Sequence, residues 1–440
     1  MTLILILGFL LIIIFLWNPI LGIFLFLITR TLSDRLADSF SLVINENISI
    51  NITGLLGITF LFLGAFYVIS KKINILSIPL IWPIILFLGI AAASMIFSVD
   101  IQASFYELTR LLTIFIFYIL AYDIFTKDLK IKKNKAQSKF ARQFPKIILI
   151  SAIIPFLIAS YQLITKTGLG GTTGIESRIY GTFIHPNNFA LFALIIFAVT
   201  IFYVLKQKQE PAKNPNKFPI YLISAFSFLM LLATLCRGAI LAALCFAFII
   251  GILKSPKIII LTATAMLILF FASENVHDRI EDIYNPPAIS TIRWRFKQWQ
   301  RGWESFSRRP WLGYGVGTEQ KAFKINHGLF EGSYHTHNDY LRSAIELGII
   351  GFSAYSFLLC WALVKLLQAY KRIKLPVNKL MALTVLALFL SVILFSASDN
   401  VLKGTAAMWI LWALVALVLA QAKKQAANLQ RKRTGPGPIN

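Results

Sequence analysis

The feature that most constrains this chain is a series of long apolar runs that recur from one end to the other. Most run for about 17–25 residues, the length that an α-helix needs to cross roughly 30 Å of hydrocarbon. Apolar and polar residues do not alternate in these runs, as they would in the strands of a membrane barrel. Apolar residues make up 57% of the chain, and its mean hydropathy of +0.72 is far above that of a soluble domain. The sequence therefore predicts an all-α polytopic membrane protein.

We predict about twelve membrane-spanning helices within a single integral membrane domain, residues 1–440. Their predicted ranges are 3–28, 53–70, 78–98, 109–126, 147–165, 189–206, 218–235, 237–253, 257–273, 347–368, 379–397 and 404–422. The run 218–253 is too long for one ordinary span, and a charge near its middle, at Arg237, is costly in lipid. We therefore divide that run at a tight turn. Residues 274–346 form a large predicted outer loop that contains short amphipathic helices.

Basic residues give the expected orientation. More than half of the 43 Lys and Arg residues lie in alternate loops and in the tail. These segments are 71–79, 127–146, 206–219, 254–257, 365–379 and 423–440. The positive-inside rule makes them cytoplasmic, together with both termini, and contact with anionic membrane lipids adds to this bias. The net charge of +24 needs no nucleic acid partner, because no basic stripe with interleaved aromatics lies on a soluble domain.

The other Lys and Arg residues lie on the wrong side for a topology signal, and all 5 histidines lie there with them. Arg178 and Arg237 occupy short outer segments, where a charge at the membrane edge usually has a partner. The loop 274–346 adds more guanidiniums, including Arg293 and Arg295. Guanidiniums hold phosphate oxygens through forked hydrogen bonds, so we expect an anion site on the outer side.

Two outer segments have recognisable local patterns. Asn187 and Asn188 follow Pro186, which suits a helix start; they either cap that helix or sit with Arg178 beside a bound phosphate. In the large loop, Arg295, Trp299 and Trp303 recur at i, i+4 and i+8. This spacing predicts one face of an amphipathic helix that lies along the membrane surface.

The outer loop ends on a pair of histidines in the run His335-Thr336-His337-Asn338-Asp339. Three interpretations are open for the pair: a general base, a structural histidine at the membrane interface, or a metal ligand. No third ligand stands out for a metal, and the three cysteines lie in apolar helices with no metal-site spacing. A neutral imidazole beside many guanidiniums favours proton transfer on a phosphate-linked substrate.

These motifs resemble the O-antigen ligase family. His337-Asn338 and Gly348-Ile349-Ile350-Gly351, with nine residues between them, match the family's H-[NSQ]-x9-G-x-x-G signature. The segment Arg237-Gly238-Ala239-Ile240-Leu241 matches its R-x3-L pattern. The outer loop with Arg295, Pro310 and Gly313 is similar to the arginine-bearing loop of the wider ligase and polymerase superfamily, and Arg178-x-x-Gly181-x-Phe183 to its preceding loop.

The resemblance implies an inverting, metal-independent GT-C type glycosyltransferase without a cofactor. Such an enzyme takes a glycan from undecaprenyl pyrophosphate at the periplasmic face of the bacterial inner membrane and passes it to a hydroxyl of lipid A-core. His337 would be the base, with Arg237 and Arg295 as catalytic partners. Contacts to the pyrophosphate or glycan are expected from Arg178, Asn187, Asn188, Arg293, His335 and Asn338.

Some residues and functions stay open at this stage. Asp339 either orients His337 or faces solvent, and Asp34 and Asp38 are expected as a solvated pair. A polymerase or a protein O-oligosaccharyltransferase would use the same lipid-linked glycan donor and differ only in the acceptor. A transporter would need ionisable residues near the bilayer midplane, and the predicted spans contain few.

Overall fold

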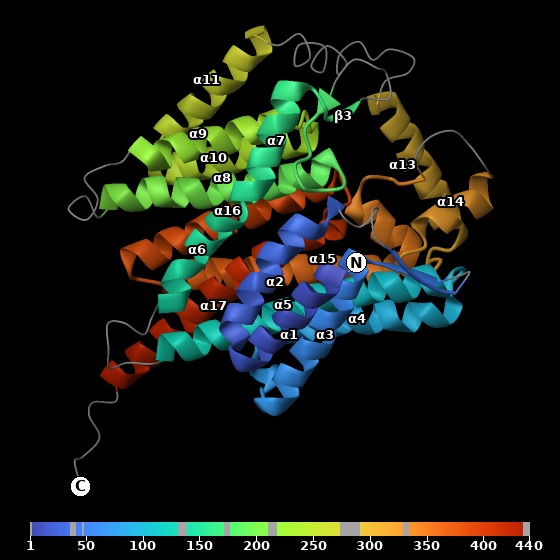
Figure 1. Ribbon diagram of the computed structural model, residues 1–440, viewed down its shortest axis with the longest axis horizontal. Coiled ribbons are helices and arrows are strands. Elements are labelled where there is room, and N and C mark those ends of the chain that lie inside the picture. Colours follow the sequence, from blue (N-terminus) through green and yellow to red (C-terminus); the bar gives the residue numbers. More distant parts are fainter. Residues whose placement is uncertain are drawn as a thin grey trace.

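The computed structural model describes residues 2–35, 41–45, 48–130, 139–170, 177–209, 218–272, 291–328 and 334–433, and these are overwhelmingly helical (Figure 1). The α-helices are α1 (Thr2–Trp17), α2 (Pro19–Ser33), α3 (Ile52–Ser70), α4 (Ile81–Ala93), α5 (Ile101–Lys130), α6 (Lys139–Ser151), α7 (Ile153–Thr165), α8 (Pro186–Gln209), α9 (Phe218–Ala233), α10 (Arg237–Lys254), α11 (Lys257–Ala272), α13 (Thr291–Arg308), α14 (Glu319–His327), α15 (Asp339–Arg372), α16 (Pro376–Ser396) and α17 (Thr405–Arg433). Helical turns η2 (Ile75–Ser77), η3 (Ser94–Phe97) and η5 (Val401–Lys403) are short. The all-α prediction is confirmed.

Two small antiparallel hairpins are the β-structure of the described residues. In the first, β1 (Ser41–Asn45) pairs with β2 (Ile48–Asn51). In the second, β3 (Leu169–Gly170) pairs with β4 (Ser177–Arg178), which places Leu169 opposite Arg178.

Among the described residues, 8 helices are long and apolar enough to cross a membrane. They cover Ile52–Ser70, Ile101–Leu129, Phe140–Thr165, Pro186–Gln209, Arg237–Lys254, Asp339–Arg372, Pro376–Ser396 and Thr405–Asn428. Each covers one of the predicted spans to within one residue. The remaining predicted spans correspond to shorter apolar helices, so the count of about twelve stays a prediction.

The prediction of one span over residues 3–28 is wrong. The chain turns at Asn18, whose side chain accepts a hydrogen bond from the backbone N–H of Leu21, and Pro19 begins α2. The turn is sharp enough to bring the ring of Phe15 to 6.1 Å from that of Phe26. A Cβ on Gly22 would lie 2.5 Å from the backbone of Phe15, so only glycine allows this approach.

The predicted division of residues 218–253 is confirmed. Helix α9 ends at Ala233 and α10 begins at Arg237. Between them, Leu235 takes a left-handed backbone conformation, with φ of 52°. The hydroxyl of Thr234 accepts a hydrogen bond from the backbone N–H of Cys236 at 3.3 Å. The turn therefore places Arg237 at the end of the bundle rather than in its middle.

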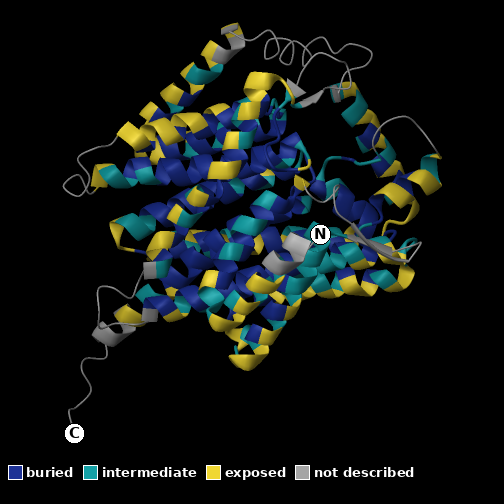
Figure 2. Ribbon diagram, viewed as in Figure 1, coloured by how far each residue is buried: buried dark blue, intermediate teal, exposed yellow. Residues whose placement is uncertain are grey.

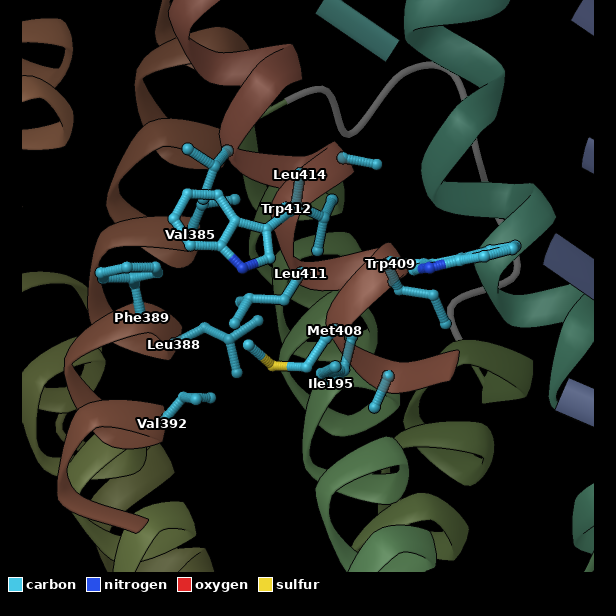
Figure 3. Packing of buried hydrophobic residues seen from close by; sticks show 14 of the residues in the cluster. Ile195, Val385, Leu388, Phe389, Val392, Met408, Trp409, Leu411, Trp412 and Leu414 are labelled. Atoms are coloured by element: carbon cyan, nitrogen blue, oxygen red, sulfur yellow. The ribbon is translucent and has the colours of Figure 1, made fainter. Parts of the chain in front are cut away.

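Helix α17 forms the centre of the bundle. In the most apolar stretch of α17, 94% of the residues are buried, against 17% in that of α3. Helix α17 packs most extensively against α5. The ring of Trp409 stacks on that of Phe117, with ring centroids 4.9 Å apart. The ring of Trp412 meets that of Phe389 edge-on, with ring centroids 5.8 Å apart (Figure 3). In lipid, such close packing replaces water exclusion as the main force between helices. Peripheral helices such as α11 keep large apolar side chains exposed, as a lipid-facing surface requires (Figure 2).

Helices α13 and α14 lie together at one end of the bundle, against the start of α15 (Figure 1). Two amphipathic helices are therefore found in the segment predicted as the large loop, of which residues 274–290 and 329–333 lie outside the described residues. The three residues predicted on one face of α13, Arg295, Trp299 and Trp303, are not equally buried. The fully buried positions of α13 are Gln298 and Ser305, whereas Trp303 is 62% exposed. Trp299 does face inward, and its indole N–H donates to the carbonyl of Thr336 at 2.8 Å.

Candidate active site

His337 lies in the loop that leads into α15, and its partner is Asp399, which follows α16. The Nδ1 atom of His337 is 3.0 Å from Oδ1 of Asp399. Burial raises the pKa of a carboxyl group, but the hydrogen bond from His337 and the charges of His337 and Arg295 outweigh it, and the pKa of Asp399 is lowered to about 2. An ionised carboxylate only accepts hydrogen bonds, so the proton of His337 sits on Nδ1. Nε2 is then the atom that can receive a proton.

The backbone holds this imidazole in place. His337 has a φ of 48°, a conformation that non-glycine residues rarely adopt and that concentrates at functional sites. The next residue, Asn338, caps α15: its Oδ1 accepts from the N–H groups of Tyr340 and Leu341 at 3.0 and 3.1 Å. Asn338 of the signature therefore fixes the start of the helix and, through it, the direction of His337.

A second histidine, His185, lies close by, with its ring centroid 6.5 Å from that of His337. Burial lowers the pKa of His185 to about 4; Asp399 opposes this shift, while Arg178 and His337 add to it. His185 is therefore neutral near pH 7. Its Nδ1 accepts the backbone N–H of Asn187 at 3.1 Å, which leaves the proton on Nε2.

Three predicted arginines lie around two neighbouring turns, the one after α16 and the one before α10. Arg295 donates from Nη1 to the carbonyl of Ser398 at 2.9 Å. Arg237 begins α10 beside Gly238, and a Cβ at Gly238 would lie only 2.0 Å from the Ser398 hydroxyl. Arg178 donates from Nε to the carbonyl of Thr234, in the turn before α10, at 2.8 Å. Arg178 and Arg295 both act on the pKa of His185, which places both charges at the imidazole pair.

The predicted asparagines have different roles. The capping interpretation is wrong, because His185 caps α8 and both asparagines lie in its first turn. The side chain of Asn187 instead accepts from Nη2 of Arg178 at 2.8 Å and so orients that guanidinium. A Cβ on Gly404 would lie 3.7 Å from Oδ1 of Asn188, which places Asn188 beside the segment before α17.

Arg293 is exposed on α13 and is not drawn into this cluster. The prediction that it contacts substrate stays untested. The contrast with Arg295 follows from helix geometry, since residues two apart on a helix point in different directions.

His335 is held in a separate network. Its Nδ1 lies 2.7 Å from Oε2 of Glu319, and Nζ of Lys403 lies 3.2 Å from the same nitrogen. Burial lowers the pKa of His335; Glu319 opposes that shift and Lys403 adds to it. Burial also lowers the pKa of Lys403 to about 8. The other carboxylate oxygen of Glu319 accepts from the N–H and hydroxyl of Thr336. His335 is thus a fixed part of the loop that carries His337.

The acidic residues left open by the sequence are now placed. Asp339 neither orients His337 nor faces solvent: it is buried, and its Oδ2 accepts from the backbone N–H of Leu402 at 3.0 Å. The expectation that Asp34 is solvated is wrong, because it is buried and 2.5 Å from Nη1 of Arg30. Asp38 lies outside the described residues.

The glycines of the signature let the outer loop pack on α15. Gly348 interrupts that helix with φ of 64°, and a Cβ there would lie 2.2 Å from the carbonyl of Trp311. The backbone N–H of Ile349 donates to Pro310 at 2.7 Å, and that of Gly315 to Glu346 at 2.8 Å. These backbone contacts anchor the loop between α13 and α14, which positions Arg295 and Glu319 over the histidines.

Within the described ranges, no group of three or more His, Cys, Asp and Glu side chains is placed to hold a metal ion. What the site offers is a histidine whose free nitrogen can take a proton, a neutral histidine that can donate one, and guanidiniums that can stabilise an anion. The site residues predicted from the sequence do not include Asp399, Glu319 or His185.

Comparisons with known proteins bear on the same residues. No curated protein matches the chain. A family model described as O-antigen ligase matches residues 222–356, from within α9 to within α15. The matched segment contains Arg237, Arg295 and His337, which the fold brings to one end of the bundle. Residues 222–356 of this chain are therefore similar to the O-antigen ligase family.

Proposed function

We propose that the protein transfers a glycan from undecaprenyl pyrophosphate to a hydroxyl group of lipid A-core, as an inverting, metal-independent ligase. The observation that carries the proposal is the pairing of His337 with Asp399 beside Arg178 and Arg295. A base oriented by a buried carboxylate suits activation of a hydroxyl, and clustered guanidiniums suit a diphosphate leaving group.

The proposed step is a single displacement. The acceptor hydroxyl gives its proton to Nε2 of His337, and its oxygen bonds to the anomeric carbon of the glycan. The bond between that carbon and the diphosphate oxygen breaks, and undecaprenyl pyrophosphate leaves with the electron pair. Attack from the face opposite the leaving group inverts the configuration. Asp399 stabilises the imidazolium that forms.

Transfer also requires that the negative charge on the leaving group be stabilised. Arg178, Arg237 and Arg295 would take up the negative charge that develops on the diphosphate, and the neutral His185 can donate through Nε2. Diphosphate is already a good leaving group, so no cofactor or nucleotide is invoked. His335 and Asn338 support the site by positioning the loop around His337.

We further propose that the site faces the periplasm from the bacterial inner membrane, in one membrane domain of about twelve spans with residues 274–346 as a periplasmic loop. The basic loops and tail support cytoplasmic termini through the positive-inside rule. A lipid-linked glycan donor explains why the cluster lies at the end of an apolar bundle.

The direct test is deletion of the gene in its own organism. We expect lipopolysaccharide to lose its O-chain while undecaprenyl-linked glycan accumulates, and a plasmid copy with Arg308→Lys, an exposed residue of α13, to restore the O-chain. Lipopolysaccharide that keeps one repeat unit would indicate a polymerase instead. Intact lipopolysaccharide with loss of protein-bound glycan would indicate a protein O-oligosaccharyltransferase.

A further inference from the structure

A cavity of about 400 Å³ lies beside the candidate active site, at the same end of the bundle. Its walls come from the end of α2, the first two turns of α3, the first half of α5 and the start of α17. The proposed transfer mechanism uses none of its lining residues. Ile58 and Thr109 in its walls are half-buried, so the cavity is reached from the surface of the protein.

Two guanidiniums give the cavity its chemistry, those of Arg30 and Arg110. Arg110 pairs with Glu107 through Nη2, but the same carboxylate oxygen of Glu107 also accepts from Nη2 of Arg342 at 2.6 Å. Glu107 therefore serves two guanidiniums, while Arg342 also pairs with Glu346 and Arg30 pairs with Asp34. The buried Nε of Arg110 has no hydrogen-bond partner among the described residues, although a buried guanidinium N–H normally has one. An anion in the cavity would supply that partner.

Helix ends strengthen the preference for an anion. Thr53 and Gly54 lie in the first turn of α3, Ala103 in that of α5, and Thr405 begins α17. The N-terminal end of each helix has a partial positive charge. Side chains cap two of these ends: Asn51 accepts from the N–H of Gly54, and Asp100 from that of Ala103. Three such ends meet around one cavity with two arginines, and this combination is suited to a phosphate group.

The cavity is separate from the site of proton transfer. The segment between α16 and α17 divides them: Asp399 at its start faces His337, and Thr405 at its end lines the cavity. Part of the remaining wall is apolar, with Ile58, Gly57 and the ring of Trp409, and part of it is polar, with side chains such as Tyr106, Glu107 and Thr113. A polar end with an apolar wall fits the head of an amphiphile rather than free phosphate.

Building on the proposed function, we propose that this cavity binds the phosphate-bearing head group of the second lipid substrate, the acceptor. The diphosphate of the glycan donor would occupy the arginines beside His185 and His337, so a second phosphorylated lipid needs its own anion site. Binding in the cavity would hold the acceptor across the segment 399–405 from the base, with its hydroxyl-bearing glycan free to reach His337.

Two variants and one control test this assignment by binding alone, without turnover. Gly57→Leu should fill the cavity, because a Cβ at Gly57 meets only Thr113, at 3.7 Å. Arg110→Gln should remove the charge. Gly89→Leu is the matched control: Gly89 is an exposed residue within α4, and a Cβ there meets nothing within 4 Å. Monodisperse elution on size-exclusion chromatography would establish that each purified variant is folded.

The probes are bisphosphorylated lipid A, dephosphorylated lipid A and undecaprenyl pyrophosphate, each titrated into detergent-purified protein and followed by native mass spectrometry. We expect Gly57→Leu and Arg110→Gln to weaken binding of bisphosphorylated lipid A by about tenfold or more, with Gly89→Leu unchanged. Dephosphorylated lipid A should bind the wild type no better than it binds Arg110→Gln. Undecaprenyl pyrophosphate binding should survive in both cavity variants.

Unchanged lipid A binding in both folded cavity variants would overturn the proposal. Selective loss of undecaprenyl pyrophosphate binding would also overturn it, because the cavity would then serve the glycan donor. These outcomes are distinct from failure of the proposed function, which the deletion experiment reports through the lipopolysaccharide itself.

Discussion

The Nδ1 atom of His337 lies 3.0 Å from Oδ1 of Asp399, although 62 positions separate the two residues in the sequence. His337 precedes α15 and Asp399 follows α16, and these two helices pack against each other. The pair is therefore created by the helical hairpin that α15 and α16 form, and any change that shifts one helix along the other would separate base from carboxylate.

Asp399→Asn should reduce transfer on the order of 10²- to 10⁴-fold. An amide can donate to Nδ1, which would favour the tautomer with the proton on Nε2, where the base must accept one. Turnover by purified enzyme, with lipid-linked glycan and acceptor, measures this. Asp123→Asn is the control, since Asp123 pairs with Lys127 in the distant half of α5. Near-normal turnover of a folded Asp399→Asn variant would show that the carboxylate does not orient the base.

Lysine should replace the site arginines poorly. Arg295→Lys and Arg237→Lys keep the charge but lose the planar fork that binds a diphosphate at two oxygens. We expect a loss of turnover of roughly 10- to 100-fold in each, about 1.4–3 kcal/mol of transition-state stabilisation. The same change at the exposed Arg308 should leave turnover intact. If all three variants behave alike, Arg237 and Arg295 are membrane-edge anchors.

His185 should act as a neutral donor over the working pH range. Burial lowers its pKa to about 4, so it stays uncharged between about pH 5 and 8. His185→Ala and His185→Asn should lower turnover to a similar degree and leave the shape of the pH–rate profile unchanged in that window. Only His185→Ala should lower the free energy of unfolding, by about 1 kcal/mol, because an asparagine at this position can still cap α8. A limb of the profile that vanishes in both variants would contradict a neutral His185.

Most helices could be predicted from the sequence, because long apolar runs leave few alternatives in a membrane. The prediction of one span over residues 3–28 is wrong because hydropathy alone does not reveal the turn at Asn18. The signal was present, since Asn18 before Pro19 is a helix start, but the apolar run continues across it and hides the turn. At 218–253, by contrast, a charge at Arg237 marked the turn.

Some residues of the candidate site could be predicted from the sequence and others could not. His337, Arg237 and Arg295 could be found because they belong to local motifs at fixed spacings. Asp399 and Glu319 could not, because each finds its histidine only through tertiary packing, across 62 and 16 positions. An ionisable residue between two apolar spans was the one sequence signal for Asp399.

The proposed topology rests on the basic loops and has its own test. In a background free of Cys236, Cys245 and Cys360, a cysteine at the exposed Lys321 should react with an impermeant thiol reagent in cells with a permeabilised outer membrane. A cysteine at the exposed Lys374 should react only after the inner membrane is opened. Labelling of position 374 in intact inner membranes would contradict the proposed orientation.

The most direct test of His337 as the base is the turnover of purified His337→Ala and His335→Ala with lipid-linked glycan and acceptor. Removing a general base typically costs about 10²- to 10⁴-fold in rate, and we expect a loss of that order for His337→Ala, with glycan-donor binding largely kept by the intact arginines. His335→Ala should lose less, because Glu319 holds His335 within the loop rather than at the reacting groups. Wild-type turnover by His337→Ala, or a greater loss in His335→Ala, would contradict the assignment.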